Sequence, residues 1–492
     1  MQATRIYTIL LVSFLLSATA NSLSAQTIIH VPLYTFHGDN ARDRFGNSVS
    51  GAGDVNGDGI PDLIVGAPWD DNNGFQSGSA RVLSGSDGSV LYNFNGDSTD
   101  DDFFDGFGVS VSSAGDVNGD GRADLIAGAF LNEFTGDYAG SVRVISGSDG
   151  SILHTFTGNG EDGFGWSVGS VGDVNGDGIP DLIVGGQYDN NNGINSGSAH
   201  VISGSDGSVL FDFNGDDAGD GFGVSVSGAG DVNGDGIPDL IVGAYRDDNS
   251  GSGTGSARVL SGSNGSVIYT FDGNNVQGGR FGWSVSSVGD VNEDGRADLI
   301  VGAPYDGNNG SQSGSARVLS GIDGSILYDF HGHSGGDHFG SSVSGAGDVN
   351  GDGIPDLIVG APWDDNNGVR SGSARVLSGS DGRILYSFDG DDSIDEFGRS
   401  VSGAGDLNGD GIDDFIVGAE KGGANDGGYA RVFVSKIFLP GDCNLDGVVN
   451  FFDIAPFISI LSAADYLAEA DIDQNGVVDF LDIQHFIALL SS

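Results

Sequence analysis

Short apolar runs alternate with Gly-, Asp-, Asn- and Ser-rich segments along most of the chain. In the stretch that begins at Phe45, this pattern predicts four strands, rich in Val, Ile, Leu and Phe and separated by turn-forming residues. The third and fourth strands are joined by SGSDGS (84–89), in which Asp-Gly predicts a hairpin turn. The four predicted strands are roughly Asn47–Ser50, Asp62–Gly66, Ala80–Ser84 and Val90–Phe94.

The same unit recurs seven times, in variants of the phrase FGxSVSxAGDVNGDGIPDLIVGAP. Regular internal repetition of this kind is typical of solenoids and propellers. Each unit has an Asp nine residues after the Phe of its Phe-Gly pair, so the register is constant. The Phe-Gly pairs begin at Phe45, Phe107, Phe164, Phe222, Phe281, Phe339 and Phe397.

The seventh unit lacks its last strand, because the chain leaves the repeat at YARVFVSKIFLPGD. A matching phrase, VPLYTFHG, stands before the first unit, and its strand (31–37) is expected to complete the last sheet. Closing a ring in this way removes exposed sheet edges, whereas a solenoid would need capping repeats. The sequence therefore predicts an all-β, seven-bladed β-propeller of four-stranded blades over residues 27–436.

Between the first two strands, each unit carries Asp-x-Asn-x-Asp-Gly-x-x-Asp. Ca²⁺ prefers six to eight oxygen ligands, and Gly at position six permits a sharp turn. Asp-Asn-Gly sequences also form ordinary turns, but four oxygen-bearing side chains in one register, seven times, indicate seven calcium sites of structural type. The predicted ligands are Asp54, Asn56, Asp58, Asp62; Asp116, Asn118, Asp120, Asp124; Asp173, Asn175, Asp177, Asp181; Asp231, Asn233, Asp235, Asp239; Asp290, Asn292, Asp294, Asp298; Asp348, Asn350, Asp352, Asp356; and Asp406, Asn408, Asp410, Asp414.

These units resemble the FG-GAP repeat of integrin α-subunit propellers and of many bacterial surface proteins, over about residues 27–436. The resemblance implies a seven-bladed propeller that holds calcium in loops between adjacent strands, with a main-chain carbonyl at loop position seven as a further ligand. Integrins carry such loops in only some blades, whereas all seven units have one here. Glu293 replaces Gly at position four of the fifth loop, and no ligand is expected to be lost.

The C-terminal stretch 441–492 contains two twelve-residue loops, DCNLDGVVNFFD and DIDQNGVVDFLD, each followed by an apolar helical pattern. Oxygen ligands in this spacing are those of an EF-hand loop. The tandem resembles a type I dockerin domain and implies two more calcium ions and a cohesin-like docking partner. Its cohesin-recognition positions, Phe451, Phe452, Phe480 and Leu481, are apolar here, unlike those of many dockerins, and a tail that packs on its own propeller is the alternative. The predicted ligands are Asp442, Asn444, Asp446, Asn450, Asp453, Asp471, Asp473, Asn475, Asp479 and Asp482.

Charge and the N-terminus indicate an exported protein. The formal net charge of -52 opposes binding to nucleic acid or anionic membranes. Nine bound Ca²⁺ would reduce it to -34, since nine divalent ions carry 18 positive charges. Residues 1–25 read as a secretory signal peptide, and no later apolar run reaches the ~18 residues of a membrane span. The lone Cys443 excludes an internal disulfide framework, so calcium is the expected source of rigidity.

Loops between the second and third strands vary most between units and are expected on the face opposite the calcium loops. At one equivalent position they carry Trp69, Leu131, Tyr188, Arg246, Tyr305, Trp363 and Lys421, which could stack on sugar rings or wedge adjacent blades. His331, His333 and His338 could hold a transition metal, but a solvated loop is the simpler interpretation.

No catalytic motif is evident, so an enzyme is not expected. We predict a secreted calcium-binding recognition or adhesion protein that binds an extracellular protein or polysaccharide. A polysaccharide-binding or polysaccharide-degrading propeller and a structural surface-layer component are the alternatives.

Overall fold

The computed structural model describes residues 27–97, 105–131, 139–160, 162–273, 278–423 and 426–438 of the chain. The chain divides into two compact units, Pro32–Val434 and Met1–Val31 with Ser435–Ser492. The first is the propeller. The predicted signal peptide (1–25) and dockerin-like module (441–492), with its ten calcium ligands, lie outside the described residues.

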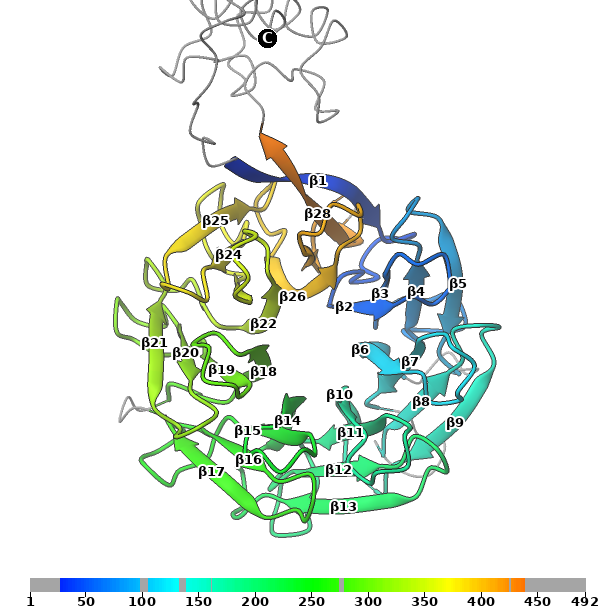
Figure 1. Ribbon diagram of the computed structural model, residues 1–492, viewed down its shortest axis with the longest axis vertical. Coiled ribbons are helices and arrows are strands. Elements are labelled where there is room, and N and C mark those ends of the chain that lie inside the picture. The colour runs from blue at the N-terminus through cyan, green and yellow to red at the C-terminus, as the bar shows by residue number, and fades with distance from the viewer. Residues whose placement is uncertain are drawn as a thin grey trace, which may run out of the picture. The chain divides into compact units, whose positions relative to one another are not determined.

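Seven four-stranded antiparallel sheets surround a common centre, which confirms the predicted all-β propeller (Figure 1). Each of the first six blades is a meander of consecutive strands, with the inner strand first. The strands are, in blade 1, β2 (Ser48–Gly53), β3 (Asp62–Ala67), β4 (Ser79–Leu83) and β5 (Val90–Asn95); in blade 2, β6 (Phe107–Gly115), β7 (Asp124–Ala129), β8 (Ser141–Ile145) and β9 (Ile152–Thr157); in blade 3, β10 (Phe164–Gly172), β11 (Asp181–Gly186), β12 (Ser198–Ile202) and β13 (Val209–Asn214); in blade 4, β14 (Phe222–Gly230), β15 (Asp239–Ala244), β16 (Ser256–Leu260) and β17 (Val267–Asp272); in blade 5, β18 (Ser284–Gly289), β19 (Asp298–Ala303), β20 (Ser315–Leu319) and β21 (Ile326–His331); and in blade 6, β22 (Ser342–Gly347), β23 (Asp356–Ala361), β24 (Ser373–Leu377) and β25 (Ile384–Asp389).

Blade 7 is built from both ends of the repeat region. Its strands are β26 (Phe397–Gly405), β27 (Asp414–Ala419), β28 (Tyr429–Phe438) and β1 (Thr27–His37), in that order from the centre outward. The predicted closing strand is therefore present and longer than expected. Just beyond it, the Gly38 amide donates to the Gly428 carbonyl at 3.0 Å, so the junction between the two chain ends is continuous.

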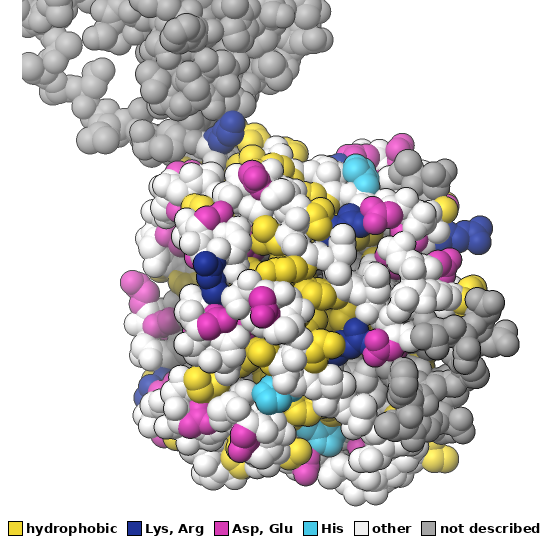
Figure 2. Space-filling view, turned by 90° about the vertical axis from the view of Figure 1, so that its right-hand side faces the viewer, with side chains coloured by type: hydrophobic (Ala, Val, Ile, Leu, Met, Phe, Trp, Pro, Cys, Tyr) yellow, Lys and Arg dark blue, Asp and Glu magenta, His cyan; other side chains and the backbone are white. Residues whose placement is uncertain are grey.

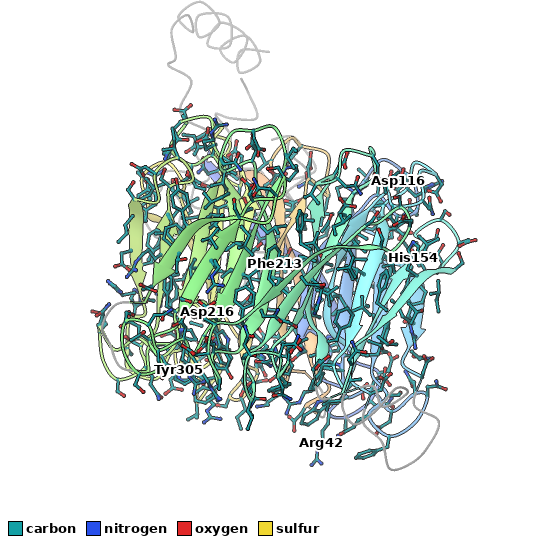
Figure 3. All side chains as sticks on the ribbon, turned by 90° about the horizontal axis from the view of Figure 1, so that it is seen from below. Arg42, Asp116, His154, Phe213, Asp216 and Tyr305 are labelled. Atoms are coloured by element: carbon teal, nitrogen blue, oxygen red, sulfur yellow. The ribbon has the colours of Figure 1, made fainter. Side chains whose placement is uncertain are left out.

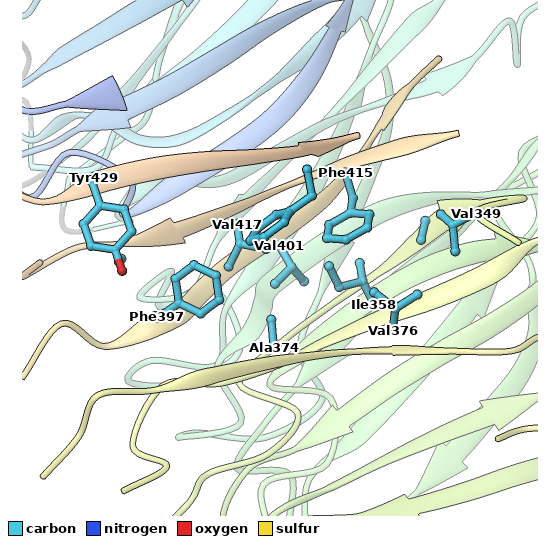
Figure 4. Close-up of a cluster of buried hydrophobic side chains, with 12 residues drawn as sticks. Val349, Ile358, Ala374, Val376, Phe397, Val401, Phe415, Val417 and Tyr429 are labelled. Carbon is cyan, nitrogen blue, oxygen red and sulfur yellow. The ribbon is translucent and has the colours of Figure 1, made fainter. Parts of the chain in front are cut away.

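The hydrophobic core lies between blades. The second strand of every blade, DLIVGA or a close variant, is buried along its whole length because other blades cover both of its faces. The cluster in Figure 4 joins Ile358 and Val376 of blade 6 to Phe397, Phe415 and Val417 of blade 7. The Phe of each Phe-Gly pair is at most 7% exposed, so the repeated Phe is a core residue.

Outer strands show the opposite pattern. Each of the first six blades begins its fourth strand with an exposed Val or Ile, and the rest of that strand is a mixture of exposed and half-buried residues. One side of the propeller accordingly shows a band of hydrophobic side chains with acidic and basic side chains beside it (Figure 2).

Two local predictions were wrong. The inner strand of blade 1 was expected to end at Ser50, but β2 continues to Gly53. Its small residues are needed where inner strands converge, since a Cβ on Gly51 would lie 3.0 Å from the Gly403 carbonyl oxygen. The SGSDGS connection is also not a two-residue Asp-Gly turn. Only Gly88 has positive φ, its amide bonds the Ser84 carbonyl at 2.9 Å, and a bulge follows Val82.

Candidate calcium loops and the variable face

The loops between the first and second strands lie at one face of the propeller. Figure 3 shows Asp116, in one of these loops, at the opposite face from Tyr305 and Arg42. The hairpins between the third and fourth strands lie on the same face as the loops, because the Ser86 hydroxyl reaches Asp58 at 2.8 Å. The predicted division into a loop face and a variable face is therefore present.

All seven loops have the same internal hydrogen bonds. In the first, Asp54 accepts from the Gly59 amide at 3.0 Å, and Asn56 Oδ1 accepts from the Asp58 amide at 2.8 Å. Asp62 Oδ2 accepts from the Val55 amide at 2.9 Å. The same three bonds recur in the other six loops. The structure thus brings together the four predicted ligands of each loop.

The Asp at position nine is fully buried in every loop. Besides the loop amide, Asp62 accepts from the Gly85 amide of the neighbouring hairpin at 3.0 Å, so this side chain ties the two segments together. Burial raises the pKa of Asp62, and raises that of Asp298 to about 6 and that of Asp356 to about 7. A buried carboxylate of this kind gains from a nearby cation.

The hairpin serines were missed by the sequence analysis. In five blades the Ser at the third position of the hairpin phrase donates its hydroxyl to the Asp at loop position five, and the amide at position seven bonds the same carboxylate. The Ile60 amide, and then the Ser86 hydroxyl, lower the pKa of Asp58. The repeated SGS phrase was the available signal, but it was interpreted only as a turn. The serines are Ser86, Ser148, Ser205, Ser263 and Ser380; in blade 5, Ile322 takes this place.

The donor set of these loops fits a hard cation. Asn56 Nδ2 lies between Asp58 Oδ2 and Asp62 Oδ1, at 3.2 and 3.3 Å. A half-turn of this carboxamide would put its oxygen in the same place, beside two carboxylates. Across the described residues, no three His, Cys, Asp or Glu side chains are already grouped as a metal site; the loop carboxylates instead accept from main-chain amides, Asn carboxamides and Ser hydroxyls. Calcium binding would exchange some of these bonds for metal contacts.

Glu293 gives a direct test of loop strain. It has φ +58°, whereas the equivalent Gly57 has φ +73° and pays no steric cost for this conformation. We expect Glu293→Gly to raise the free energy of unfolding by about 0.5–1 kcal/mol in urea titrations with saturating calcium. Gly176→Glu, at the same position of the third loop, is the matched control and should lower it; an unchanged or less stable Glu293→Gly protein would contradict this interpretation.

On the variable face, aromatic side chains pack against one another. The Trp283 ring makes edge contacts with Tyr245 and Tyr305, at centroid distances of 5.1 and 5.9 Å. His338 stacks on Trp363 at 4.1 Å. The Tyr245–Trp283 contact joins blades 4 and 5, and a Tyr305–His338 contact at 4.6 Å joins blades 5 and 6, so the structure favours wedging over exposed stacking platforms.

The three histidines do not form one group. His338 is buried, whereas His333 is exposed and His331 ends β21. Burial, and then the charges of Arg280 and Arg370, lower the pKa of His338 to about 4, so its ring is neutral at pH 7. The prediction that His338 lies in a solvated loop is therefore wrong.

Six blades carry a further repeated contact that the sequence analysis missed. An arginine from the third strand lies over the Phe of the Phe-Gly pair, as Arg143 lies over Phe107 at 4.7 Å. In blade 3, His200 takes this place beside Phe164. Many of the chain's few basic residues therefore have a structural role.

Comparison with known proteins agrees with this geometry. The FG-GAP repeat model matches all seven units, which together cover more than half of the chain: residues 45–83, 107–145, 164–202, 222–260, 281–319, 339–377 and 397–433. Within the described part of the chain, no helix combines the length and apolar character needed to cross a bilayer.

Integrin α chains are among the relatives. The protein is 34% identical to integrin alpha-5 of Xenopus laevis over 220 residues, which is 40% of this chain and 20% of that one. It is 33% identical to integrin alpha-V of Gallus gallus over 210 residues, again 40% and 20% of the two chains. The chain thus spans about a fifth of the length of these relatives. With seven matched repeats and seven four-stranded blades, it belongs to the FG-GAP repeat proteins.

Proposed function

We propose that this protein is an extracellular, calcium-stabilised recognition protein whose propeller binds its ligand on the variable face. The observation that carries the proposal is the difference between the two faces. One repeats the same hydrogen-bonded loop seven times, whereas the other presents different side chains at equivalent positions. Repetition with local variation is typical of a scaffold that carries a binding surface.

Calcium binds at the seven loops in this proposal, through the position-one, -three, -five and -nine side chains. The ion supplies positive charge to a group of carboxylates, one of them buried in each loop. Its role is structural, and no residue is assigned to catalysis. The C-terminal module adds two calcium ions and acts as a docking handle for a cohesin-like partner.

Apolar residues at the tips of the variable loops support the location of the ligand surface. Phe75, Ile194 and Val369 stand at the same position of blades 1, 3 and 6 and are 51%, 75% and 64% exposed. Large apolar side chains held out from a folded loop are a feature of interaction surfaces. The similarity to integrin α chains supports an adhesion role.

The test measures where a ligand binds. The immobilised full-length protein is exposed to extracellular matrix proteins and polysaccharides, with calcium and with chelator. We expect calcium-dependent binding that the combined Phe75→Asp, Ile194→Asp and Val369→Asp changes abolish. Asp87→Asn with Asp206→Asn, on the opposite face, is the control and should bind normally. Binding that maps to the loop face, or no binding by folded calcium-loaded protein, would contradict the proposal.

A further inference from the structure

One side of the variable face departs from the repeat at a strained backbone position. The residue before each Phe-Gly pair has positive φ in all seven blades. Blades 2, 3 and 4 have glycine there, which pays no steric cost, but blades 5, 6, 7 and 1 have Arg280, His338, Glu396 and Arg44. Each of these costs of order 1 kcal/mol, and such strain concentrates at functional sites. The four strained blades are consecutive around the ring.

Two of these residues, His338 and Glu396, line a cavity of about 200 Å³. It lies where blades 5, 6 and 7 meet, and Glu420 and Lys421 form one wall in place of the Pro-aromatic pairs of blades 5 and 6. The whole chain has only six glutamates, and two of them line this cavity. The other walls include Tyr305, His338, Trp363, Glu396 and Arg399.

Three buried polar atoms at this cavity have no hydrogen-bond partner: His338 Nε2, Arg399 Nε and Glu420 Oε2. His338 and Glu420 are each only 3% exposed. Arg399 Nε is 3.6 Å from Glu420 Oε2, too far for a good hydrogen bond. Unsatisfied buried groups are costly, so their accumulation at one cavity marks a place where a bound molecule, water or ligand, can satisfy them.

These three atoms without a partner favour a ligand that can both donate and accept hydrogen bonds. Arg399 Nε is a donor, Glu420 Oε2 an acceptor, and the neutral His338 ring can offer either. Hydroxyl groups meet all three demands, whereas a carboxylate side chain only accepts and an ammonium only donates. The cavity is also smaller than the 300–1,000 Å³ typical of drug-sized ligands, which suits a single ring.

Charge around the cavity favours an acidic ring. The two glutamates are paired, Glu396 with Lys421 at 2.7 Å and Glu420 with Arg44 at 3.0 Å. Arg399 adds a further positive charge. Beyond the walls, Arg280 lies 3.9 Å over Tyr305 and Arg370 lies 4.1 Å over Trp363. Two bases thus match the two acids in the lining, and Arg44, Arg280 and Arg370 add basic groups just beyond it, although the chain as a whole is strongly acidic.

The same contacts exclude ring stacking as the main interaction. Trp363 is covered by His338 and Arg370, and Tyr305 by His338 and Arg280. A ligand therefore meets ring edges, prolines and polar atoms.

We propose that this cavity binds one sugar unit of an extracellular polysaccharide, with a preference for a sugar that carries a carboxylate. This rests on the proposed function, because it assigns a ligand class to the variable face. The hydroxyls bond Glu420, His338 and Arg399, and the carboxylate lies toward Arg399 and Lys421. Binding alone is proposed, and no bond is broken.

The test is isothermal titration of the full-length calcium-loaded protein with tri-galacturonate and with neutral maltotriose. We expect tri-galacturonate to bind at least tenfold more tightly. His338→Gly and Lys421→Met should each weaken its binding at least tenfold. His338→Gly installs the residue that blades 2–4 already have at this φ, so the protein should fold normally. Arg246→Ala, at the position of Lys421 on blade 4, is the matched control and should bind like the parent.

Absence of saccharide binding, equal binding of both trisaccharides, or binding that both pocket variants leave unchanged would overturn this inference. If a matrix protein still binds the variable face in the preceding assay while no saccharide does, the recognition function stands and the sugar cavity is wrong. If neither binds to folded protein, both are wrong.

Discussion

Removal of calcium should lower the thermal unfolding midpoint of the full-length protein by more than about 10 °C. A ligand that binds only the folded state stabilises it by about 4 kcal/mol per site at a thousand times its dissociation constant. Each of the seven loops places three carboxylates within nine residues. In six loops, the described hydrogen bonds to the buried carboxylate all come from amide groups. These buried residues are Asp62, Asp124, Asp181, Asp239, Asp298 and Asp356. Without the ion, these groups repel one another.

Scanning calorimetry with 2 mM calcium and then with excess chelator measures the change. Readdition of calcium should restore the midpoint, and magnesium should restore much less of it because Mg²⁺ demands a tighter octahedral site. The combined change Asp239→Asn and Asp235→Asn, which disables one loop, should remove only part of the calcium effect. A midpoint that is indifferent to chelator would contradict the structural role of calcium.

Deletion of residues 1–37 should prevent formation of a stable ring. These residues include β1, which supplies the outer strand of blade 7 and also contacts blade 1: Tyr34 bonds the Ser86 carbonyl at 3.1 Å, and Arg81 bonds the His37 carbonyl at 3.1 Å. Loss of the strand removes several hydrogen bonds worth about 1 kcal/mol each and leaves β28 as an open edge. We expect a cooperative unfolding transition at much lower temperature, with self-association.

Deletion of residues 1–26 is the matched control, since it retains β1, and should melt like the parent. Size-exclusion chromatography and circular dichroism report the two outcomes. A synthetic β1 peptide should partly restore the truncated protein, as strand addition does for an exposed sheet edge. A truncated protein that stays monomeric with an unchanged midpoint would show that β1 does not close the ring.

The propeller could be predicted because the repeat spacing, the strand pattern and the displaced closing strand all indicate the same fold. Seven identical registers of Phe-Gly and Asp set the blade number, and the displaced phrase VPLYTFHG identified the closing strand. The ends of strands were predicted less accurately, because glycine occurs both in turns and in closely packed strands. Gly51 was left outside the predicted strand, but it lies in β2, where the Gly403 carbonyl oxygen of the neighbouring inner strand would be 3.0 Å from a Cβ.

The candidate sites were predicted unequally. Calcium-loop side chains are local in sequence, so their convergence follows from spacing alone. Contacts between distant segments could not be read in this way: Ser86 bonds Asp58 across 28 residues, and Arg44 pairs with Glu420 across 376. The cavity at blades 5–7 depends on three different repeats and on a backbone conformation that the sequence does not display.

The most direct test of a calcium-loaded propeller is the calcium content of the full-length protein. Inductively coupled plasma mass spectrometry after dialysis against micromolar calcium gives the number of ions per chain. Seven loops with the same donor set predict at least seven, and the C-terminal module would raise this to nine. Two ions or fewer would be explained by the C-terminal module alone and would contradict calcium binding by the propeller.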